Sequence, residues 1–197
     1  TGFGKEHAEG RTTGDLKEFW HFGQDLNAHP NLKGIYPDNI HVKELHHFNS
    51  VGNQVFKKLE KTAEVLLQAI ALYLGLDEFY FDPYIQEGNS ILRAIHYPPI
   101  TQAPEEAERA AAHGDINLIT LLMGSQGGGL QVLNRNEKWI DAVAAPDELM
   151  INIGDMLSRL TNNHLPSTIH RVVNPPQEEW GKARFSLPFF MHPVPKM

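Results

Sequence analysis

The sequence contains no cysteine among its 197 residues. Disulfide bonds, iron–sulfur clusters, cysteine-ligated zinc and thiol chemistry are therefore excluded. The absence is compatible with a reducing compartment, and a cytoplasmic location is the expectation.

Long apolar runs and an excess of basic charge are missing as well. No stretch approaches the roughly 20 consecutive apolar residues of a membrane-spanning helix, so no membrane association is expected. Seventeen Lys and Arg stand against 24 Asp and Glu, which gives a net charge of −7. With no basic stripe visible, this balance argues against a nucleic-acid partner. Apolar residues make up 41% of the chain, which is ordinary for a globular domain with a real core.

One long amphipathic helix is predicted from residues 50 to 74. Its apolar residues recur at steps of three or four, with Lys and Glu between them. Asn49 or Ser50 can cap its start, and Gly75 can end it. At 1.5 Å per residue such a helix is about 37 Å long, enough to brace one sheet. The apolar positions are Val51, Val55, Leu59, Leu66, Ile70 and Leu74.

In the rest of the chain, short apolar runs alternate with Gly, Pro and Asn residues, a pattern that predicts short strands separated by turns. About eight strands with no repeat indicate a jelly roll or barrel, so the fold class is mainly β with a helical brace (α+β by order). We expect residues 1–88 to form a helical and loop segment and residues 89–197 a β core, together one structural domain. A turn is expected at Gly127–Gly129. The strand runs are 15–23, 90–97, 118–123, 130–133, 139–143, 149–153, 168–173 and 184–191.

Two histidines and one carboxylate form a candidate metal site. His113 and Asp115 are two residues apart, so in a strand or its extension they point to the same side. His170 lies in a separate predicted strand, which a jelly roll can bring face to face with the first. Imidazole and carboxylate ligands suit iron(II), and zinc would also bind them. His-x-Asp alone is a weak signal, because it also occurs by chance.

Arg184 and Ser186 form a candidate anion site. They share a strand face within the apolar run RFSLPFF. A guanidinium can pair with a carboxylate through two hydrogen bonds, and a hydroxyl can add a third. Tyr97 offers a phenol for the same use. Taken alone, Arg184 is better explained by a structural salt bridge to an Asp or Glu, because a buried charge needs a partner.

Taken together, these residues resemble the iron(II)- and 2-oxoglutarate-dependent dioxygenases of the isopenicillin N synthase-like group. The segments HGDINLITLLM, GLQV, INIGD, STIHRV and RFSLPFF resemble that family's motifs in the same order. The stretch from Leu92 to Pro99 is similar to a further tyrosine-containing motif. The resemblance covers about residues 15 to 195. Family members carry a further N-terminal segment, which we expect to be missing from this chain.

The resemblance implies a double-stranded β-helix (a cupin-like jelly roll) braced by a long helix. It implies that His113, Asp115 and His170 bind iron(II), and that Arg184 and Ser186, with Tyr97, hold the distal carboxylate of 2-oxoglutarate. The implied reaction uses O2, oxidises a small-molecule substrate and releases succinate and carbon dioxide. Arg93 is the candidate contact for that substrate, whose identity the sequence does not reveal.

Departures from the family pattern and a second branch keep alternatives open. Ile95 and His96 replace residues common in the family, and we expect His96 to be a packing residue. Related halogenases have a small residue where this chain has Asp115, so hydroxylation, desaturation or ring closure are favoured over halogenation. An oxidase branch uses the Arg-x-Ser pair for its substrate without 2-oxoglutarate. The remaining alternative is a non-catalytic jelly-roll protein that binds a metal or ligand.

Overall fold

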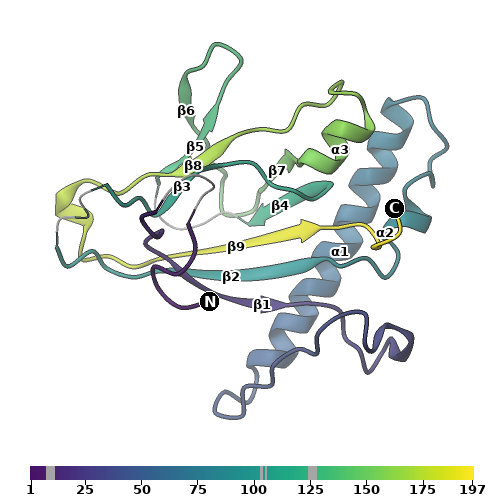
Figure 1. Ribbon diagram of the computed structural model, residues 1–197, viewed down its shortest axis with the longest axis horizontal. Coiled ribbons are helices and arrows are strands. Elements are labelled where there is room, and N and C mark those ends of the chain that lie inside the picture. Colours follow the sequence, from purple (N-terminus) through teal and green to yellow (C-terminus); the bar gives the residue numbers. More distant parts are fainter. Residues whose placement is uncertain (8–11, 103, 105, 124–127) are drawn as a thin grey trace.

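Two antiparallel sheets face each other in a jelly-roll sandwich (Figure 1). The computed structural model describes residues 1–7, 12–102, 104, 106–123 and 128–197. In this part of the chain the major sheet has the order β1-β2-β9-β4-β7 and the minor sheet the order β3-β8-β5-β6. The strands of the major sheet are β1 (Glu18–Phe22), β2 (Ile91–Tyr97), β9 (Arg184–Met191), β4 (Ile119–Met123) and β7 (Leu149–Ile153). Those of the minor sheet are β3 (Ala110–His113), β8 (His170–Val172), β5 (Leu130–Leu133) and β6 (Trp139–Asp141).

Each of the strand runs predicted from the sequence contains a strand of the structure, and the jelly-roll class is confirmed. Strand β3 and the short helix α3 (Asp155–Leu160) lie outside the predicted elements. Short helices also lie at α2 (Asp82–Ile85), Pro30–Leu32 and Gln177–Glu179. The predicted turn at Gly127–Gly129 falls partly outside the described residues. Gly129 itself has a φ of 100°, which favours glycine.

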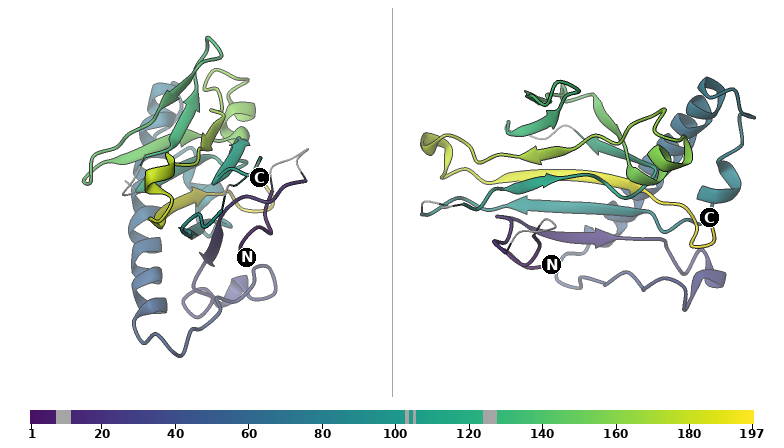
Figure 2. Two further views of the ribbon diagram at one scale, coloured as in Figure 1. Left: turned by 90° about the vertical axis from the view of Figure 1, so that its left-hand side faces the viewer. Right: turned by 45° about the horizontal axis from the view of Figure 1, so that its top comes forward.

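Helix α1 (Phe48–Tyr73) is the predicted brace, and it lies along one face of the major sheet (Figure 2). Its C-terminal end follows the prediction, because Gly75 adopts a φ of 72° after the last turn. The amides of Gly75 and Leu76 then donate to the carbonyls of Leu72 and Ala71, which closes the helix with a Schellman motif. The predicted cap at the other end is wrong: Asn49 instead bonds the backbone of Ile40 and Val42.

The buried face of α1 differs from the predicted one. Its buried stripe is offset by one residue from most of the predicted positions, and Val51 is 52% exposed. Most of the predicted apolar residues flank this stripe and are only partly buried against the core. The reason is close approach: small residues on the buried stripe let the helix backbone lie near the sheet. The stripe consists of Gly52, Phe56, Leu59, Ala63, Leu67 and Ala71.

The main core lies between α1 and the major sheet and includes Leu121 of β4 and Phe189 of β9, both 0% exposed. A second, smaller cluster lies inside the sandwich, where Ile95 and Tyr97 of β2 meet Ala110 and Val172 of the minor sheet. Within the described residues, no helix is long and apolar enough to cross a membrane. The helix therefore fixes the outer face of the major sheet, and the inner face is left for the site.

Substitution of Gly52 by Ala tests the close approach of α1. An added Cβ would lie 2.3 Å from two ring atoms of the buried Phe22. Alanine gains about 1 kcal/mol of helix propensity over glycine, but overpacking costs about 1–3 kcal/mol, so a net loss of up to about 2 kcal/mol in unfolding free energy is expected. Urea denaturation measures this, with Gln54→Ala on the exposed face of the same helix as the matched control. A Gly52→Ala protein more stable than the wild type would contradict the close contact.

Candidate metal centre

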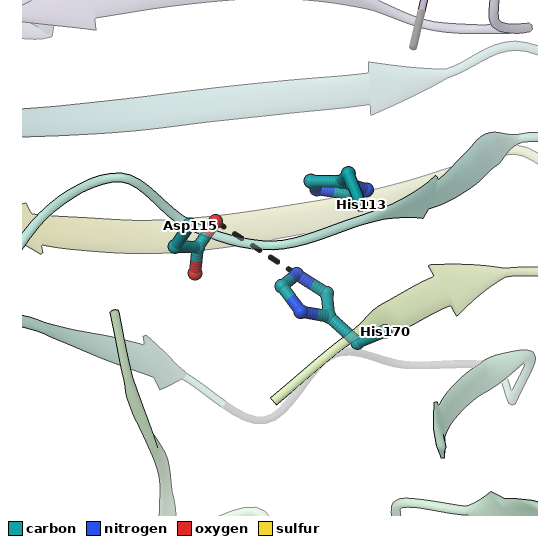
Figure 3. Close-up of side chains that lie close together, drawn as sticks. All are labelled: His113, Asp115 and His170. Atoms are coloured by element: carbon teal, nitrogen blue, oxygen red, sulfur yellow. Dashed lines mark ion pairs between the residues drawn. The ribbon is translucent and has the colours of Figure 1, made fainter. Parts of the chain in front are cut away.

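His113, Asp115 and His170 come together inside the sandwich, as the sequence predicted (Figure 3). One ligand atom from each lies within 4.8 Å of the other two. The strand pairing causes this, because His113 at the end of β3 is directly opposite His170 at the start of β8. The two imidazole rings are 4.4 Å apart, and Nε2 of His170 is 3.8 Å from Oδ1 of Asp115. The three side chains could hold one metal ion.

Both histidines offer the same ring nitrogen, Nε2, to the candidate metal position, because both Nδ1 atoms face backbone carbonyls. Nδ1 of His113 lies 2.7 Å from the carbonyl of Ala111, and Nδ1 of His170 lies 3.1 Å from that of Thr168. A carbonyl can only accept, so each Nδ1 carries a proton, and in the neutral form of each ring the lone pair is on Nε2. Such contacts fix the orientation and tautomer of metal-binding imidazoles.

The two carboxylate oxygens of Asp115 have different neighbours. Oδ2 accepts hydrogen bonds from Oγ1 of Thr120, at 2.6 Å, and from Nδ2 of Asn152, at 2.9 Å. Thr120 on β4 and Asn152 on β7 are directly opposite in register, so one strand pair supplies both donors. Asn117 in turn donates to Thr120, at 3.0 Å. Oδ1 is thereby left on the side of His170.

Burial lowers the pKa of His113, and the charge that His170 carries when protonated lowers it further. Because the rings lie close together, a second positive charge between them is unfavourable. The lowered pKa keeps His113 in the neutral form, which is the form that binds a metal. The lowered pKa of His113 therefore favours the protonation state that a bound cation requires.

The predicted anion site is also assembled. Arg184 and Ser186 lie on one face of β9, and Tyr97 on β2 is directly opposite Arg184. All three side chains are buried, with Arg184 3% exposed. Arg184 donates a hydrogen bond to Tyr97, and its guanidinium carbon lies 5.0 Å from the centre of the Tyr97 ring. Burial lowers the pKa of Arg184 and raises that of Tyr97.

One cavity of about 270 Å³ is lined by all the predicted site residues, which are His113, Asp115, His170, Arg184, Ser186, Tyr97 and Arg93. Much of its remaining wall is apolar, including Leu122, Leu130 and Val132. This size lies near the lower end of pockets that hold small molecules. A single small molecule can therefore be in reach of the metal-binding atoms and the guanidinium within one apolar enclosure.

Arg93 lies at the boundary between this cavity and a second one of about 530 Å³, which we call the chamber. His113 and Asp115 also line the chamber, together with Glu6, Asp15, Asp155 and His192. The Arg93 guanidinium lies 4.0 Å from the centre of the Phe19 ring and donates to Glu6 and to His21. It is therefore held in place at the rim of both cavities.

Some expectations about single residues need correction or addition. Gly114 separates His113 from Asp115, but a Cβ there would make only contacts of 3.4 Å or more, so glycine is not required at this position. His96 is a packing residue, as expected, stacked on Phe185 and bonded to Glu18. Sequence reasoning missed Thr120 and Asn152. The available signal was a polar residue within each of the apolar runs ITLLM and LMINI.

Comparison with known proteins gives a consistent assignment. The sequence profile of the 2OG-Fe(II) oxygenase superfamily matches residues 88–193. A "2-oxoglutarate-Fe(II) type oxidoreductase" from Aspergillus fumigatus is 34% identical over 167 residues, which cover 84% of this chain and 47% of that protein. The chain spans about half the length of the curated relatives it matches.

Two solved structures are similar in fold. One is a protein of Caulobacter crescentus ascribed to the 2OG-Fe(II) oxygenase family, with 48% identity, a TM-score of 0.86, and coverage of 98% of this chain and 62% of that one. The other is full-length Neurospora crassa T7H in complex with α-ketoglutarate (2-oxoglutarate), with 32% identity, a TM-score of 0.82, and coverage of 93% and 57%.

The residues matched by the family profile include the metal-binding cluster and all three residues of the predicted anion site. The sequence motifs, the sandwich and the cavity therefore agree with the comparisons, and the expected metal and cosubstrate are those in the family's own description. This chain belongs to the 2OG-Fe(II) oxygenase superfamily.

Proposed function

We propose that this protein is an iron(II)- and 2-oxoglutarate-dependent oxygenase that oxidises a small-molecule substrate, by hydroxylation. One observation carries the proposal: a single apolar cavity is lined both by the His113, Asp115 and His170 cluster and by Arg184 with Ser186 and Tyr97. A metal-binding protein without catalytic function would not need a buried guanidinium in the same enclosure.

The residues present fit iron(II) and 2-oxoglutarate. Two neutral imidazoles and one carboxylate are the donor set of iron(II) oxygenases that leave other positions of the metal open. When bound, iron(II) and 2-oxoglutarate supply O2 activation coupled to oxidative decarboxylation, with release of succinate and carbon dioxide. His113, Asp115 and His170 would hold the metal, and the hydrogen bonds to Ala111, Thr168, Thr120 and Asn152 would orient them.

Arg184 would bind the distal carboxylate of 2-oxoglutarate. A guanidinium can offer two parallel donors to a carboxylate, and Ser186 and Tyr97 can add hydroxyl donors. The apolar wall would exclude water and strengthen this charge pair. The buried cation is stabilised most when an anion reaches it, so the cavity is selective for a dicarboxylate that can contact the metal and Arg184 together.

The substrate would enter from the chamber and contact Arg93, since this side chain lines both cavities. The Neurospora crassa T7H structure has also been solved with thymine, at 33% identity and a TM-score of 0.78 over 91% of this chain and 54% of that one. A small polar molecule of that size class suits the charged rim. We place the protein in the cytoplasm as part of the same proposal, because a reducing compartment keeps iron in the ferrous state.

Loss of His113 tests the metal assignment. Anaerobic titration of the wild type with iron(II) and 2-oxoglutarate should produce a weak visible charge-transfer band, and His113→Ala should remove it, because one of three ligands is gone. His164→Ala is the matched control, since that imidazole stacks on Tyr73 and is not in the metal-binding cluster. No band and no succinate under air with the wild type would refute the proposal. Oxygen uptake without succinate would instead indicate an oxidase that does not use 2-oxoglutarate.

Arg184→Ala tests the anion site. Removing one partner of a buried charge pair costs about 2–5 kcal/mol, so the Kd for 2-oxoglutarate should rise on the order of 100-fold. Iron(II) binding should persist, because the metal-binding cluster is unchanged. Arg184→Lys should give an intermediate Kd, since lysine keeps the charge without the two-pronged geometry. Arg171→Ala, on the other side of the minor sheet from the cavity residue His170, is the control. An unchanged Kd in Arg184→Ala would show that 2-oxoglutarate binds elsewhere.

Arg93→Gln tests the substrate contact. The variant should keep the slow, substrate-independent decarboxylation of 2-oxoglutarate, because Arg93 is outside both the metal-binding cluster and the anion site. Stimulation of that decarboxylation by a substrate found in a compound screen should fall, through a higher KM for the substrate. Equal stimulation in the wild type and the variant would exclude Arg93 from substrate binding.

A further inference from the structure

Residues 15 and 16 bind along the outer edge of β3, the strand that carries His113. β3 is an edge strand of the minor sheet and pairs with β8 at Ala110 and His113, with a shift of register between them. On its open side, the amide of Leu16 donates to the carbonyl of Glu108, at 2.9 Å. Oδ1 of Asp15 accepts from the amide of Ala111, at 3.1 Å. The segment before β1 thus replaces a neighbouring strand at this edge.

Ala111 connects Asp15 to the metal-binding cluster. Its amide donates to Asp15, and its carbonyl accepts from Nδ1 of His113, at 2.7 Å. Ala111 is 1% exposed, so in the intact fold its amide is paired with the carboxylate and not with solvent. The hydrogen bond to Asp15 fixes the amide of Ala111, and the hydrogen bond that the Ala111 carbonyl accepts sets the ring orientation of His113. A shift of Ala111 would therefore be passed directly to Nε2 of His113.

Asp15 is itself held firmly. Its other oxygen, Oδ2, lies 2.8 Å from Nζ of the buried Lys17, and Lys17 lies 2.8 Å from Glu6. Burial works to lower the pKa of Lys17, but its hydrogen bonds to Asp15 and Glu6 outweigh burial, and the pKa is raised. Asp15 is 5% exposed and has one oxygen for Ala111 and one for the ammonium group. As in Asp115, the two carboxylate oxygens of Asp15 therefore have different partners.

We propose that Asp15 is a positioning residue for the metal ligand His113, acting through the hydrogen bond from its Oδ1 to the backbone of Ala111. The inference rests on the proposed function only in that His113 binds a metal. It assigns a second role to a segment more than 90 residues away, whose backbone contacts would otherwise be read as fold alone. The negative charge of Asp15 stabilises Lys17, whereas its Oδ1 accepts the hydrogen bond from Ala111 that positions His113.

Two substitutions separate the acceptor from the charge. Asp15→Asn keeps an acceptor at Oδ1 and loses the charge. Asp15→Glu keeps the charge for Lys17 and moves the acceptor away from Ala111. Asn39→Ala is the control for general loss of stability, because Asn39 also holds a chain segment by side-chain hydrogen bonds, to Gly23 and Gln24, outside the metal-binding cluster.

The measurement is titration of the full chain with Co(II), which binds the same donors as iron(II) and gives visible absorption bands. Thermal unfolding of the metal-free proteins is recorded in parallel. Loss of a contact that orients a metal ligand typically weakens metal binding by about 10- to 100-fold. We expect Asp15→Glu to lose about tenfold in Co(II) affinity and to change the band shape. Asp15→Asn should stay within about threefold of the wild type, whatever its melting temperature, and Asn39→Ala should bind normally.

Each other outcome overturns the inference. Normal Co(II) binding by Asp15→Glu would show that Ala111 needs no help to orient His113. Loss in Asp15→Asn with normal binding in Asp15→Glu would assign the effect to charge. Equal losses in both variants, or in Asn39→Ala, would assign it to stability of the fold. Failure of the wild type to bind Co(II) would instead count against the proposed function.

Discussion

The pairing of β3 with β8 is the interaction on which the site depends, because it places His113 directly opposite His170. Two imidazoles 4.4 Å apart would repel each other if both were protonated. Nδ1 of each ring instead faces a backbone carbonyl two residues earlier in its own chain segment and donates a proton to it. The repulsion and the two hydrogen bonds act in the same direction, and both leave the Nε2 lone pairs available to a cation.

The third ligand, Asp115, is held by hydrogen bonds from residues of the major sheet. Asp115 follows β3, but its Oδ2 is held by Thr120 of β4 and Asn152 of β7, both in the major sheet. The metal-binding cluster therefore exists only when the two sheets are closed on each other. Helix α1 packs on the outer face of the major sheet, so the main core and the site are coupled through β4 and β9. The geometry of the metal-binding cluster therefore depends on the stability of the main core between α1 and the major sheet.

Local patterns explain what could be predicted from the sequence. The alternation of strand side chains placed Arg184 and Ser186 on one face, and helical spacing placed α1 to within two residues at its start and one at its end. Strand β3 was missed because Ala110, Ala111 and Ala112 carry none of the β-branched or aromatic side chains that mark strands. The buried face of α1 was misplaced for a related reason, since Gly52, Ala63 and Ala71 are weakly apolar but allow close approach.

Contacts between distant segments could not be predicted in this way. Nothing near Asp15 in the sequence indicates that it reaches the backbone of Ala111, and nothing near Asp115 indicates that Thr120 and Asn152 share one of its oxygens. These pairings follow from the register of the sheets, which depends on the whole sandwich. The sequence motifs identified the groups that would meet a ligand, whereas the groups that orient them became visible only in three dimensions.

Opposite charges are paired both in the cavity of about 270 Å³ and beside it. A buried guanidinium is costly without an anion, and a buried metal cation is costly without negative ligands. In the proposed loaded state, the formal charges of iron(II) and Arg184 equal those of Asp115 and a dianionic cosubstrate, so the apolar cavity would carry no net charge. At the rim, Lys17 and Arg93 are matched by Asp15 and Glu6. Each group of charges is neutral by itself, so the rim can hold its geometry whether or not the inner cavity is filled. This independence is what a positioning contact from Asp15 to His113 requires, because the scaffold that orients a ligand must be in place before the metal arrives.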